Sequence, residues 1–333
     1  QGKPVREAIG EVIYCAMLFE FYAGECKRTY GRQLVRPTGQ SARVIYVPVG
    51  PVAGFAAWNF PAINVARKIG GAIAAGCSVI VKPSEETPYC GGLLFAEVFE
   101  EAGIPDGVLN VNTCSRGNVT EIGDELIENP LVKGISFTGS TAVVRQVAAR
   151  AGAHLKKCCL ELGGKDALIV CDDADMDRAT GAANFGSFMH QGQICMSVEK
   201  ILVQESVFDE FLKGFIERAS KLKMGDPTKD KANVIGPLIN DKQANKSREQ
   251  IADAVAKGAE IVLGGTVKDR FVEPTILLGV TPDMRIYREE NFGPVVPVIP
   301  FKTDEEAVAI ANDTEYGLSS GVITRDEYRG LRI

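Results

Sequence analysis

Histidine is scarce in this chain, with only His154 and His190 among 333 residues. That scarcity leaves little material for a nucleophile activated by a histidine base, whether the nucleophile is cysteine or serine. If covalent chemistry occurs, we expect a glutamate to be the proton acceptor.

Other motifs are missing too. The sequence has no G-x-G-x-x-G, so a standard dinucleotide fingerprint is absent. Its nine cysteines form no C-x-x-C pair and no paired metal-ligand spacing, so we expect no metal site. In a chain of this length they indicate a reduced, intracellular protein rather than a disulfide scaffold, and we expect a cytoplasmic one.

Long hydrophobic runs and concentrated basic runs are also absent. Apolar stretches such as residues 49–57 are far too short to span a bilayer, and no signal peptide opens the chain. The formal charge of −6 argues against a surface that binds polyanions. We therefore expect a soluble protein without a membrane or nucleic-acid partner.

From Val52 onward, short apolar runs alternate with helical patterns. This alternation predicts βα units wound into a mostly parallel sheet, and thus an α/β fold. The predicted strands include residues 78–81, 108–111, 134–138 and 166–170. The predicted helices include residues 87–102, 207–221 and 241–257, and one that begins near Ser140.

Residues 32–47 behave differently, because two alternating runs flank the turn sequence Pro-Thr-Gly-Gln at residues 37–40. The pattern predicts an antiparallel hairpin between the first helix and the sheet. Such a hairpin often serves subunit pairing, and we expect a homo-dimer or homo-tetramer. The alternative is a surface hairpin that covers a sheet edge.

A domain boundary is predicted near Gly163 and Gly164, where one set of αβ units ends and another begins. Both chain ends look cut, so we expect a fragment of a longer protein. The first helix follows Pro4 directly and has apolar positions at Val5, Ile9, Val12, Ala16 and Phe19.

Cys195 lies in residues 192–197 (Gly-Gln-Ile-Cys-Met-Ser), a polar turn after an apolar helical stretch. A lone cysteine is usually a small buried hydrophobe. Here the turn allows the side chain to face a cleft, where backbone N–H groups lower a thiol pKa. We therefore interpret Cys195 as a nucleophile.

Glu161 opens residues 161–165 (Glu-Leu-Gly-Gly-Lys) at the end of an apolar run. Its carboxylate is either paired with Lys156, Lys157 or Lys165, or kept for catalysis. Burial would raise its pKa toward neutrality, as a general base requires. The two glycines that follow permit close backbone approach to a ligand, which favours catalysis.

Asn59 lies in residues 57–61 (Ala-Trp-Asn-Phe-Pro), between an apolar run and a helix that Pro61 can open. The carboxyl edge of a sheet is where ligands of open α/β sheets bind, and an amide there could hold an oxyanion. On this motif alone, a helix N-cap is the favoured interpretation.

Two further motifs follow predicted strands. In residues 82–85 (Lys-Pro-Ser-Glu), a lysine and an acid could grip an adenosine ribose, or could be solvated loop charges. Residues 137–141 (Phe-Thr-Gly-Ser-Thr) close a strand and open a helix, so a pyrophosphate could rest on the helix N-terminus.

Together these motifs resemble the aldehyde dehydrogenase superfamily, in the family's order, from Gly2 to about Arg325. The resemblance implies a Rossmann-type cofactor lobe, an α/β catalytic lobe and an inserted oligomerisation hairpin. It implies a cofactor-binding domain at residues 1–162, interrupted by the hairpin at 32–48, and a catalytic domain at 163–333.

The resemblance also implies roles for single residues. Cys195 would be the nucleophile, Asn59 the oxyanion donor, Glu161 the activator of water and Lys68 part of a proton relay. The expected contacts to NAD, with NADP possible, are Trp58, Lys82, Ser84, Glu85, Gly139, Ser140, Glu290 and Phe292. Glu85 favours NAD, because a carboxylate would repel a 2′-phosphate.

The chain departs from the family pattern in two places. Ala57 stands where many members have proline, which affects loop stiffness. Val144 stands where a glycine usually follows the Thr-Gly-Ser-Thr segment, which affects the expected pyrophosphate site. The family normally extends past both ends of this chain.

The implied reaction is attack of the Cys195 thiolate on an aldehyde, hydride transfer, and hydrolysis of the thioester by water that Glu161 deprotonates. Residues 185–197 resemble members that act on aromatic aldehydes such as benzaldehyde or vanillin. An aliphatic aldehyde or a semialdehyde is the alternative substrate. Three alternative functions are an acylating dehydrogenase, a thiol hydrolase and a catalytically silent relative. Glu161 argues against the acylating dehydrogenase.

Overall fold

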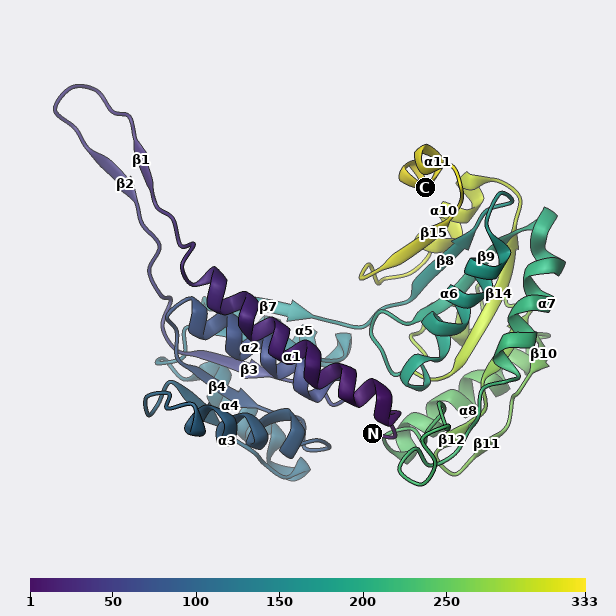
Figure 1. Ribbon diagram of the computed structural model, residues 1–333, viewed down its shortest axis with the longest axis horizontal. Coiled ribbons are helices and arrows are strands. Elements are labelled where there is room, and N and C mark those ends of the chain that lie inside the picture. Colours follow the sequence, from purple (N-terminus) through teal and green to yellow (C-terminus); the bar gives the residue numbers. More distant parts are fainter. The chain divides into compact units, whose positions relative to one another are not determined.

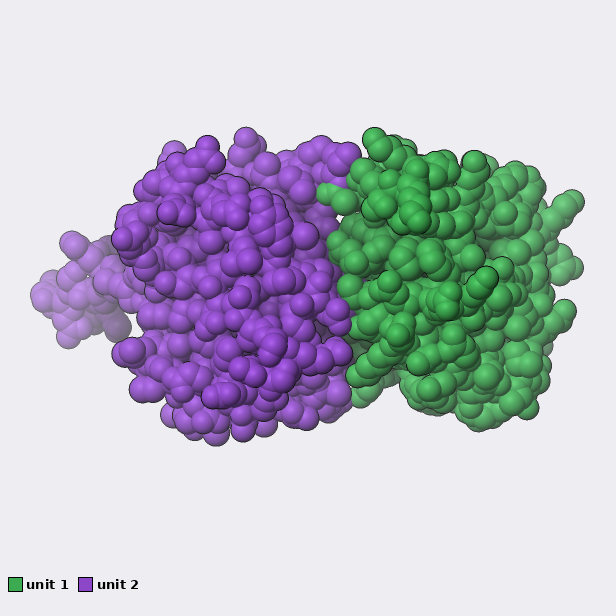
Figure 2. Space-filling view, turned by 90° about the horizontal axis from the view of Figure 1, so that it is seen from below, with its two compact units in different colours: residues 1–8, 163–333 green, residues 9–162 purple.

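A computed structural model describes residues 1–333, and the chain divides into two compact units. Unit 1 comprises Gln1–Ala8 and Gly163–Ile333, and unit 2 comprises Ile9–Leu162 (Figure 2). Residues 1–8 thus group with unit 1, whereas we expected them with residues 9–162. The functional roles of the two units remain predictions.

Unit 2 is built on a five-stranded sheet in the order β5-β4-β3-β6-β7, and every pairing is parallel (Figure 1). The strands are β3 (Val52–Phe55), β4 (Val79–Lys82), β5 (Leu109–Val111), β6 (Gly134–Thr138) and β7 (Lys157–Glu161). The predicted strands at residues 78–81, 108–111 and 134–138 are confirmed. The strand order reverses between β3 and β6, and open α/β sheets usually bind ligands at the carboxyl ends of strands at such a point.

Helices cover both faces of this sheet. They are α1 (Val5–Glu25), α2 (Pro61–Ala74), α3 (Leu94–Glu101), α4 (Val119–Glu128) and α5 (Thr141–Ala153), with short η1 (Tyr89–Leu93) and η2 (Arg116–Asn118) before α3 and α4. Residues of α1, α2 and α3 share one core cluster, and residues of α4 and α5 share another. In α1, Glu11 and Cys15 are buried, while the apolar Ile9 and Val12 are 57% and 58% exposed.

The predicted hairpin is confirmed. β1 (Arg32–Leu34) and β2 (Ala42–Val44) pair antiparallel, with Gln33 opposite Arg43, and form a two-stranded sheet of their own. The hairpin projects away from the rest of unit 2 (Figure 1). Since it pairs with no other sheet, the alternative that it covers a sheet edge is wrong.

Unit 1 contains a six-stranded sheet in the order β10-β13-β14-β9-β8-β15, in which only β10 is antiparallel to its neighbour. The strands are β8 (Asp166–Val170), β9 (Val198–Gln204), β10 (Glu260–Leu263), β13 (Thr275–Leu278), β14 (Val295–Phe301) and β15 (Ser320–Ile323). β11 (Val267–Lys268) and β12 (Phe271–Val272) form a small separate pair.

Helices pack on the unit 1 sheet through alternate residues of its strands. In β9, Ile201 and Val203 share a core cluster with α6 and α7, whereas Leu202 packs with α10. The helices are α6 (Met176–Phe188), α7 (Phe208–Ala219), α8 (Asp241–Ala256), α9 (Arg285–Arg288), α10 (Asp304–Asn312) and α11 (Glu327–Arg332), and the short ones are η3 (Met189–Gly192) and η4 (Glu205–Val207). None of the helices combines the length and apolar character that crossing a membrane requires.

Candidate active site

In unit 2 the predicted site residues gather at the carboxyl edge of the parallel sheet. Asn59 follows β3, Lys82 ends β4, Ser140 follows β6 and Glu161 ends β7. Phe55 at the end of β3 pairs in register with both Lys82 and Phe137, so these strand ends are level. The gathering surrounds the point where the strand order reverses, which is where open α/β sheets bind ligands.

Asn59 is 5% exposed and does not cap the following helix. The N-cap residue of α2 is Phe60, and the carboxylate of Glu11 accepts from the backbone N–H groups of Ala62 and Ile63 at 2.8 and 3.2 Å. The N-cap interpretation of Asn59 is therefore wrong. Its Oδ1 accepts from Asn64 Nδ2 at 3.4 Å. Since an amide donates only through its nitrogen, the predicted oxyanion donor is Asn59 Nδ2.

Lys68 lies on α2, 9% exposed, and its Nζ donates to Ser136 Oγ at 3.2 Å and Thr138 Oγ1 at 2.8 Å. Burial lowers the pKa of Lys68 to about 8, partly opposed by the nearby Cys159 and Glu161. A lysine with a pKa near 8 can exchange protons in neutral solution. Glu161 thus lies near enough to Lys68 for its charge to act on the ammonium, although the hydrogen bonds of Lys68 go to Ser136 and Thr138.

Glu161 is exposed at the end of β7, so the burial that we considered for it is not found. Lys165 is bound to Glu199 at 2.8 Å, and Lys156 donates to the carbonyl of Asn129 at 2.7 Å. Both lysines therefore have other partners, and the structure gives no support to an ion pair of Glu161 with either.

Lys82 is 6% exposed, and its Nζ donates to the carbonyl of Pro83 at 3.1 Å. Its interpretation as a solvated loop charge is therefore wrong. Ser84, also buried, accepts from the backbone N–H of Glu86 at 3.3 Å. Glu85 receives Arg116 Nε at 3.3 Å, a partner that the sequence pattern did not indicate.

The start of α5 fits the pyrophosphate of a dinucleotide. Ser140 is the N-cap residue of α5, its side chain makes no capping bond, and Gly139 precedes it. Thr141 Oγ1, in the first turn of α5, is buried without a hydrogen-bond partner. A buried hydroxyl in the first turn of a helix suits the oxygens of a pyrophosphate. Val144 is 2% exposed, so it packs in the core beneath this turn.

In unit 1 the predicted residues lie at the amino ends of neighbouring strands. Gly164 precedes β8, Cys195 precedes β9 and Glu290 precedes β14. A Cβ atom on Gly164 would collide with the Cys195 carbonyl oxygen, and one on Gly163 would lie 2.5 Å from Glu290 Oε1. These glycines thus allow the protein's own segments to approach each other, where we had expected them to admit a ligand.

The turn that carries Cys195 follows α6, as predicted. His190, Gln191 and Gly192 all have left-handed backbones, with φ of 48°, 57° and 71°. Two side chains hold the turn, and sequence reasoning missed both: Gln191 Nε2 donates to the Gly2 carbonyl at 2.7 Å, and Gln193 Oε1 accepts from the Ile239 N–H at 2.9 Å. Cys195 is half-buried on this turn, and its lowered thiol pKa remains a prediction.

Glu290 accepts from the backbone N–H of Gly164 at 3.1 Å. Burial, and then the negative charge of Glu199, raise its pKa to about 7. Phe292 has a left-handed backbone with φ of 59°, which is costly for a bulky residue. Such strain persists where surrounding contacts enforce it, so this segment is constrained by its neighbours.

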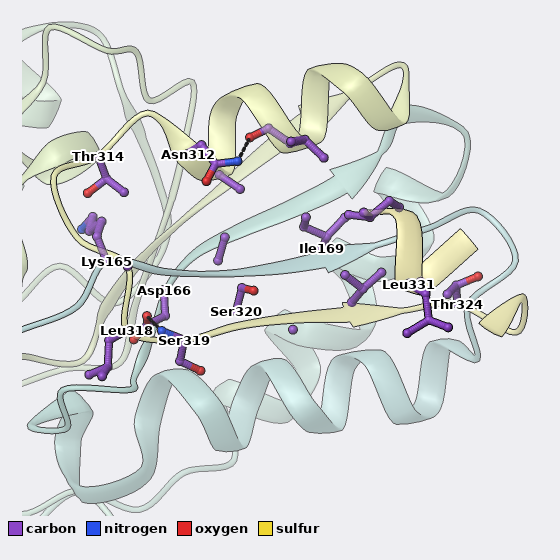
Figure 3. A pocket seen from close by; sticks show the side chains of 18 of the residues that line it. Lys165, Asp166, Ile169, Asn312, Thr314, Leu318, Ser319, Ser320, Thr324 and Leu331 are labelled. Atoms are coloured by element: carbon purple, nitrogen blue, oxygen red, sulfur yellow. Dashed lines mark hydrogen bonds between the residues drawn. The ribbon is translucent and has the colours of Figure 1, made fainter. Parts of the chain in front are cut away.

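A cavity of about 860 Å³ in unit 1 lies beside β15, between residues of β8, α10 and α11. Figure 3 shows Asp166 beside Ser319, whose backbone N–H donates to Asp166 Oδ1 at 2.7 Å. Burial raises the pKa of Asp166 to about 7. No residue predicted for catalysis or cofactor binding lines this cavity.

Comparison with known proteins gives one family. Residues 1–333 match the model of the Aldehyde dehydrogenase family. The mitochondrial succinate-semialdehyde dehydrogenase of Arabidopsis thaliana is 44% identical over 338 residues, covering 100% of this chain and 63% of the relative. A second relative is the Escherichia coli (strain K12) protein named succinate-semialdehyde dehydrogenase (NADP(+)) GabD. It is 43% identical, and the match covers 100% of this chain and 69% of the relative.

A solved structure carries a different substrate name. The salicylaldehyde dehydrogenase of Pseudomonas putida G7, complexed with salicylaldehyde, superposes with a TM-score of 0.94 at 41% identity. The match covers 97% of this chain and 66% of that one. The two-lobed α/β fold is thereby confirmed.

Proposed function

The chain belongs to the aldehyde dehydrogenase family, and we propose that the protein oxidises an aldehyde to a carboxylic acid with NAD or NADP. The observation that carries this proposal is the packing around Cys195. Its turn lies against Gly164 and Gly293, next to the Glu290 segment, so a thiol and a predicted cofactor segment are held together.

We assign the first step to Cys195. Its thiolate adds to the aldehyde carbonyl and forms a thiohemiacetal, and the family resemblance assigns the Asn59 amide and the Cys195 N–H as donors to its oxyanion. A bound nicotinamide supplies the acceptor for the hydride that leaves the substrate carbon. The product of this step on the protein is a thioester at Cys195 Sγ.

We assign hydrolysis of the thioester to Glu161 and Lys68. The Glu161 carboxylate takes a proton from water as the hydroxide attacks the thioester carbonyl, and the carboxylic acid leaves as Cys195 regains its thiolate. Lys68, whose pKa is affected by the charge of Glu161, then relays the proton toward solvent. Its pKa near 8 suits this exchange.

We assign the cofactor contacts as the family resemblance implies them. Lys82, Ser84 and Glu85 would hold the adenosine ribose, and Gly139 and Ser140 would hold the pyrophosphate. Glu290 and Phe292 would hold the nicotinamide and its ribose, and Trp58 is a further predicted contact. The buried, unpartnered Thr141 Oγ1 supports the pyrophosphate part.

For the substrate we propose a semialdehyde, because two relatives that are 44% and 43% identical to this chain are named succinate-semialdehyde dehydrogenases. The aromatic aldehyde that we expected from residues 185–197 has weaker support from these names. A semialdehyde carries a carboxylate, which requires a cation or several N–H donors in the binding site.

An aromatic aldehyde remains the second candidate because of the residues beside the nucleophile. Phe185 and Met196 are 66% and 55% exposed, and residues 185–197 contain no lysine or arginine. Apolar side chains without a cation suit a ring better than a carboxylate. The salicylaldehyde dehydrogenase match agrees with this observation.

The test follows formation of NADH or NADPH with succinate semialdehyde and with benzaldehyde. We expect turnover by the wild type, a loss of more than about 10³-fold in Cys195→Ala, and at most a single-turnover burst in Glu161→Gln. Cys26→Ala, which removes an exposed thiol outside the predicted site, should retain full activity. Absence of reduced cofactor with every aldehyde would contradict the proposal.

A further inference from the structure

Glu199 is a buried carboxylate four residues after Cys195, inside β9. Its side chain is 4% exposed, and three donors surround it. Lys165 Nζ and the backbone N–H of Asn291 reach Oε2 at 2.8 and 2.7 Å, and the backbone N–H of Phe292 reaches Oε1 at 2.8 Å. These contacts join β9, the strand that follows Cys195, to the segment that contains Glu290.

Lys165 and Glu199 form a buried ion pair. The Lys165 side chain is fully buried, so its ammonium and the Glu199 carboxylate depend on each other. A buried ion pair adds little stability compared with apolar residues of similar size, because both ions lose their hydration. Its hydrogen bonds do fix geometry, since they are short, directional and charge-assisted.

The geometry that they fix is the backbone of residues 290–292. On its other side, α8 holds the same backbone: Gln243 Nε2 donates to the carbonyls of Asn291 and Phe292 at 2.7 and 2.9 Å. The left-handed Phe292 therefore has its N–H fixed by Glu199 and its carbonyl fixed by Gln243. Without both contacts, relaxation of the strained residue would move the Glu290 side chain.

We propose that Glu199 is a positioning residue for the cofactor. It holds residues 290–292 against β9, the strand that follows Cys195, and so sets where the nicotinamide ribose lies relative to the thiol. Glu199 touches neither substrate nor cofactor and acts through Glu290 and Phe292. This inference rests on the proposed function, because those two residues are predicted cofactor contacts.

The test compares Glu199→Gln with the wild type in the full chain. The variant keeps the shape of the side chain but places an NH₂ group toward Lys165 and the Asn291 N–H, which are both donors. We expect the dissociation constant of NADH, measured by its fluorescence, to rise at least about tenfold. Alkylation of Cys195 by iodoacetamide, which needs no cofactor, should change by less than about threefold.

Two further variants separate positioning from stability. Lys200→Met removes a different buried ammonium from the same strand, one that donates to the carbonyls of Ile310 and Asp313, and should leave the NADH dissociation constant within about twofold. The double variant Glu199→Met with Lys165→Met replaces the ion pair by apolar residues, which often preserves the fold, and should bind NADH as weakly as Glu199→Gln.

The outcomes are distinct. If folded Glu199→Gln or the double variant binds NADH as tightly as the wild type, the positioning role is overturned. If Lys200→Met weakens NADH binding equally, the effect is general loss of stability and the proposal fails. A wild type that binds NADH but oxidises no aldehyde would refute the proposed function while the Glu199 effect still shows in the binding data.

Discussion

Arg116 lies beside Glu85 and bears on the expected preference for NAD over NADP. Its guanidinium reaches Glu85 Oε1 at 3.3 Å and Glu86 Oε1 at 3.5 Å, and the Arg116 side chain is 69% exposed. Glu85 alone would repel a 2′-phosphate, but an adjacent arginine supplies the cation that such a phosphate needs. The predicted ribose site therefore contains a group suited to each cofactor, with Glu85 for NAD and Arg116 for NADP.

We predict that Arg116→Ala lowers kcat/KM for NADP by about five- to tenfold and leaves kcat/KM for NAD within about twofold, as expected for loss of one exposed phosphate contact. The measurement is the ratio of the two constants with one aldehyde. Arg150→Ala, at the far end of α5, is the matched control. An unchanged ratio in Arg116→Ala would show that the arginine does not serve the phosphate.

Lys68 leads to a pH prediction. Its neutral form accepts protons and its pKa is lowered to about 8, so the hydrolysis rate should rise as pH increases through about 8. Lys68→Met should lose this rise and retain the first burst of NADH. Single-turnover and steady-state rates measured from pH 6 to pH 10 test the point, and an identical profile in the variant would contradict the relay.

The same residue links stability to pH. Between pH 8 and 10.5 the folded protein holds fewer protons on Lys68 than the unfolded chain does, so the free energy of unfolding rises with pH across this window. The full cost of burying the charge applies below pH 8. The stability advantage of Lys68→Met over the wild type should thus shrink above that pH, as chemical denaturation can measure.

At the scale of elements, α1 supports the start of α2 through one carboxylate. Glu11 on α1 binds the N–H groups of Ala62 and Ile63, at the end of α2 where a negative charge is favourable. α2 carries Lys68, and Asn59 lies just before it. The position of both predicted catalytic residues therefore depends on this contact.

We predict that Glu11→Ala lowers the free energy of unfolding by about 1–3 kcal/mol, because two buried backbone donors lose their acceptor. Glu20→Ala, a change on an exposed face of α1, is the control and should stay within about 0.5 kcal/mol. Urea denaturation measures both. Equal stability of Glu11→Ala and the wild type would show that the α2 terminus finds another acceptor.

The hydrophobic periodicity and the turn residues predicted the helices and strands well, because both are properties of the local sequence. The strand at residues 134–138 and the helix from Asp241 follow directly from them. The partners of Glu11, Glu199 and Arg116 were not predictable, because the contacting residues lie 51, 92 and 31 positions away. A signal did exist for Glu199, since a Glu-Lys pair interrupts the apolar strand Val198–Gln204.

The motifs named the site residues, yet their local surroundings differ from what the pattern suggested. The predicted site residues of unit 2 lie at the carboxyl ends of parallel strands, where ligands usually bind, whereas those of unit 1 precede their strands. Gly163 and Gly164 are needed for contacts with Glu290 and Cys195, a requirement that only the folded chain reveals.

At the scale of the whole molecule, the hairpin of β1 and β2 predicts assembly. Val35 is 100% exposed, and Ile45, Tyr46 and Val47 beside the strands are 72%, 64% and 71% exposed. Apolar side chains in such a projecting segment indicate a surface that another copy of the chain covers.

We predict that replacing residues 32–44 with a short Gly-Ser linker lowers the mass in light scattering from that of a dimer or tetramer to a smaller species. Unit 2 should still unfold cooperatively, because the hairpin pairs with no strand of its sheet. An unchanged mass would place the subunit contact elsewhere.

The central claim is that Cys195 becomes acylated and that Glu161 is needed to remove the acyl group. The most direct measurement is the intact mass and peptide map of Glu161→Gln after mixing with succinate semialdehyde or benzaldehyde and NAD. We predict an added acyl group on the Cys195 peptide that does not form without NAD. Reduced cofactor without any adduct, or an adduct on another of the nine cysteines, would contradict it.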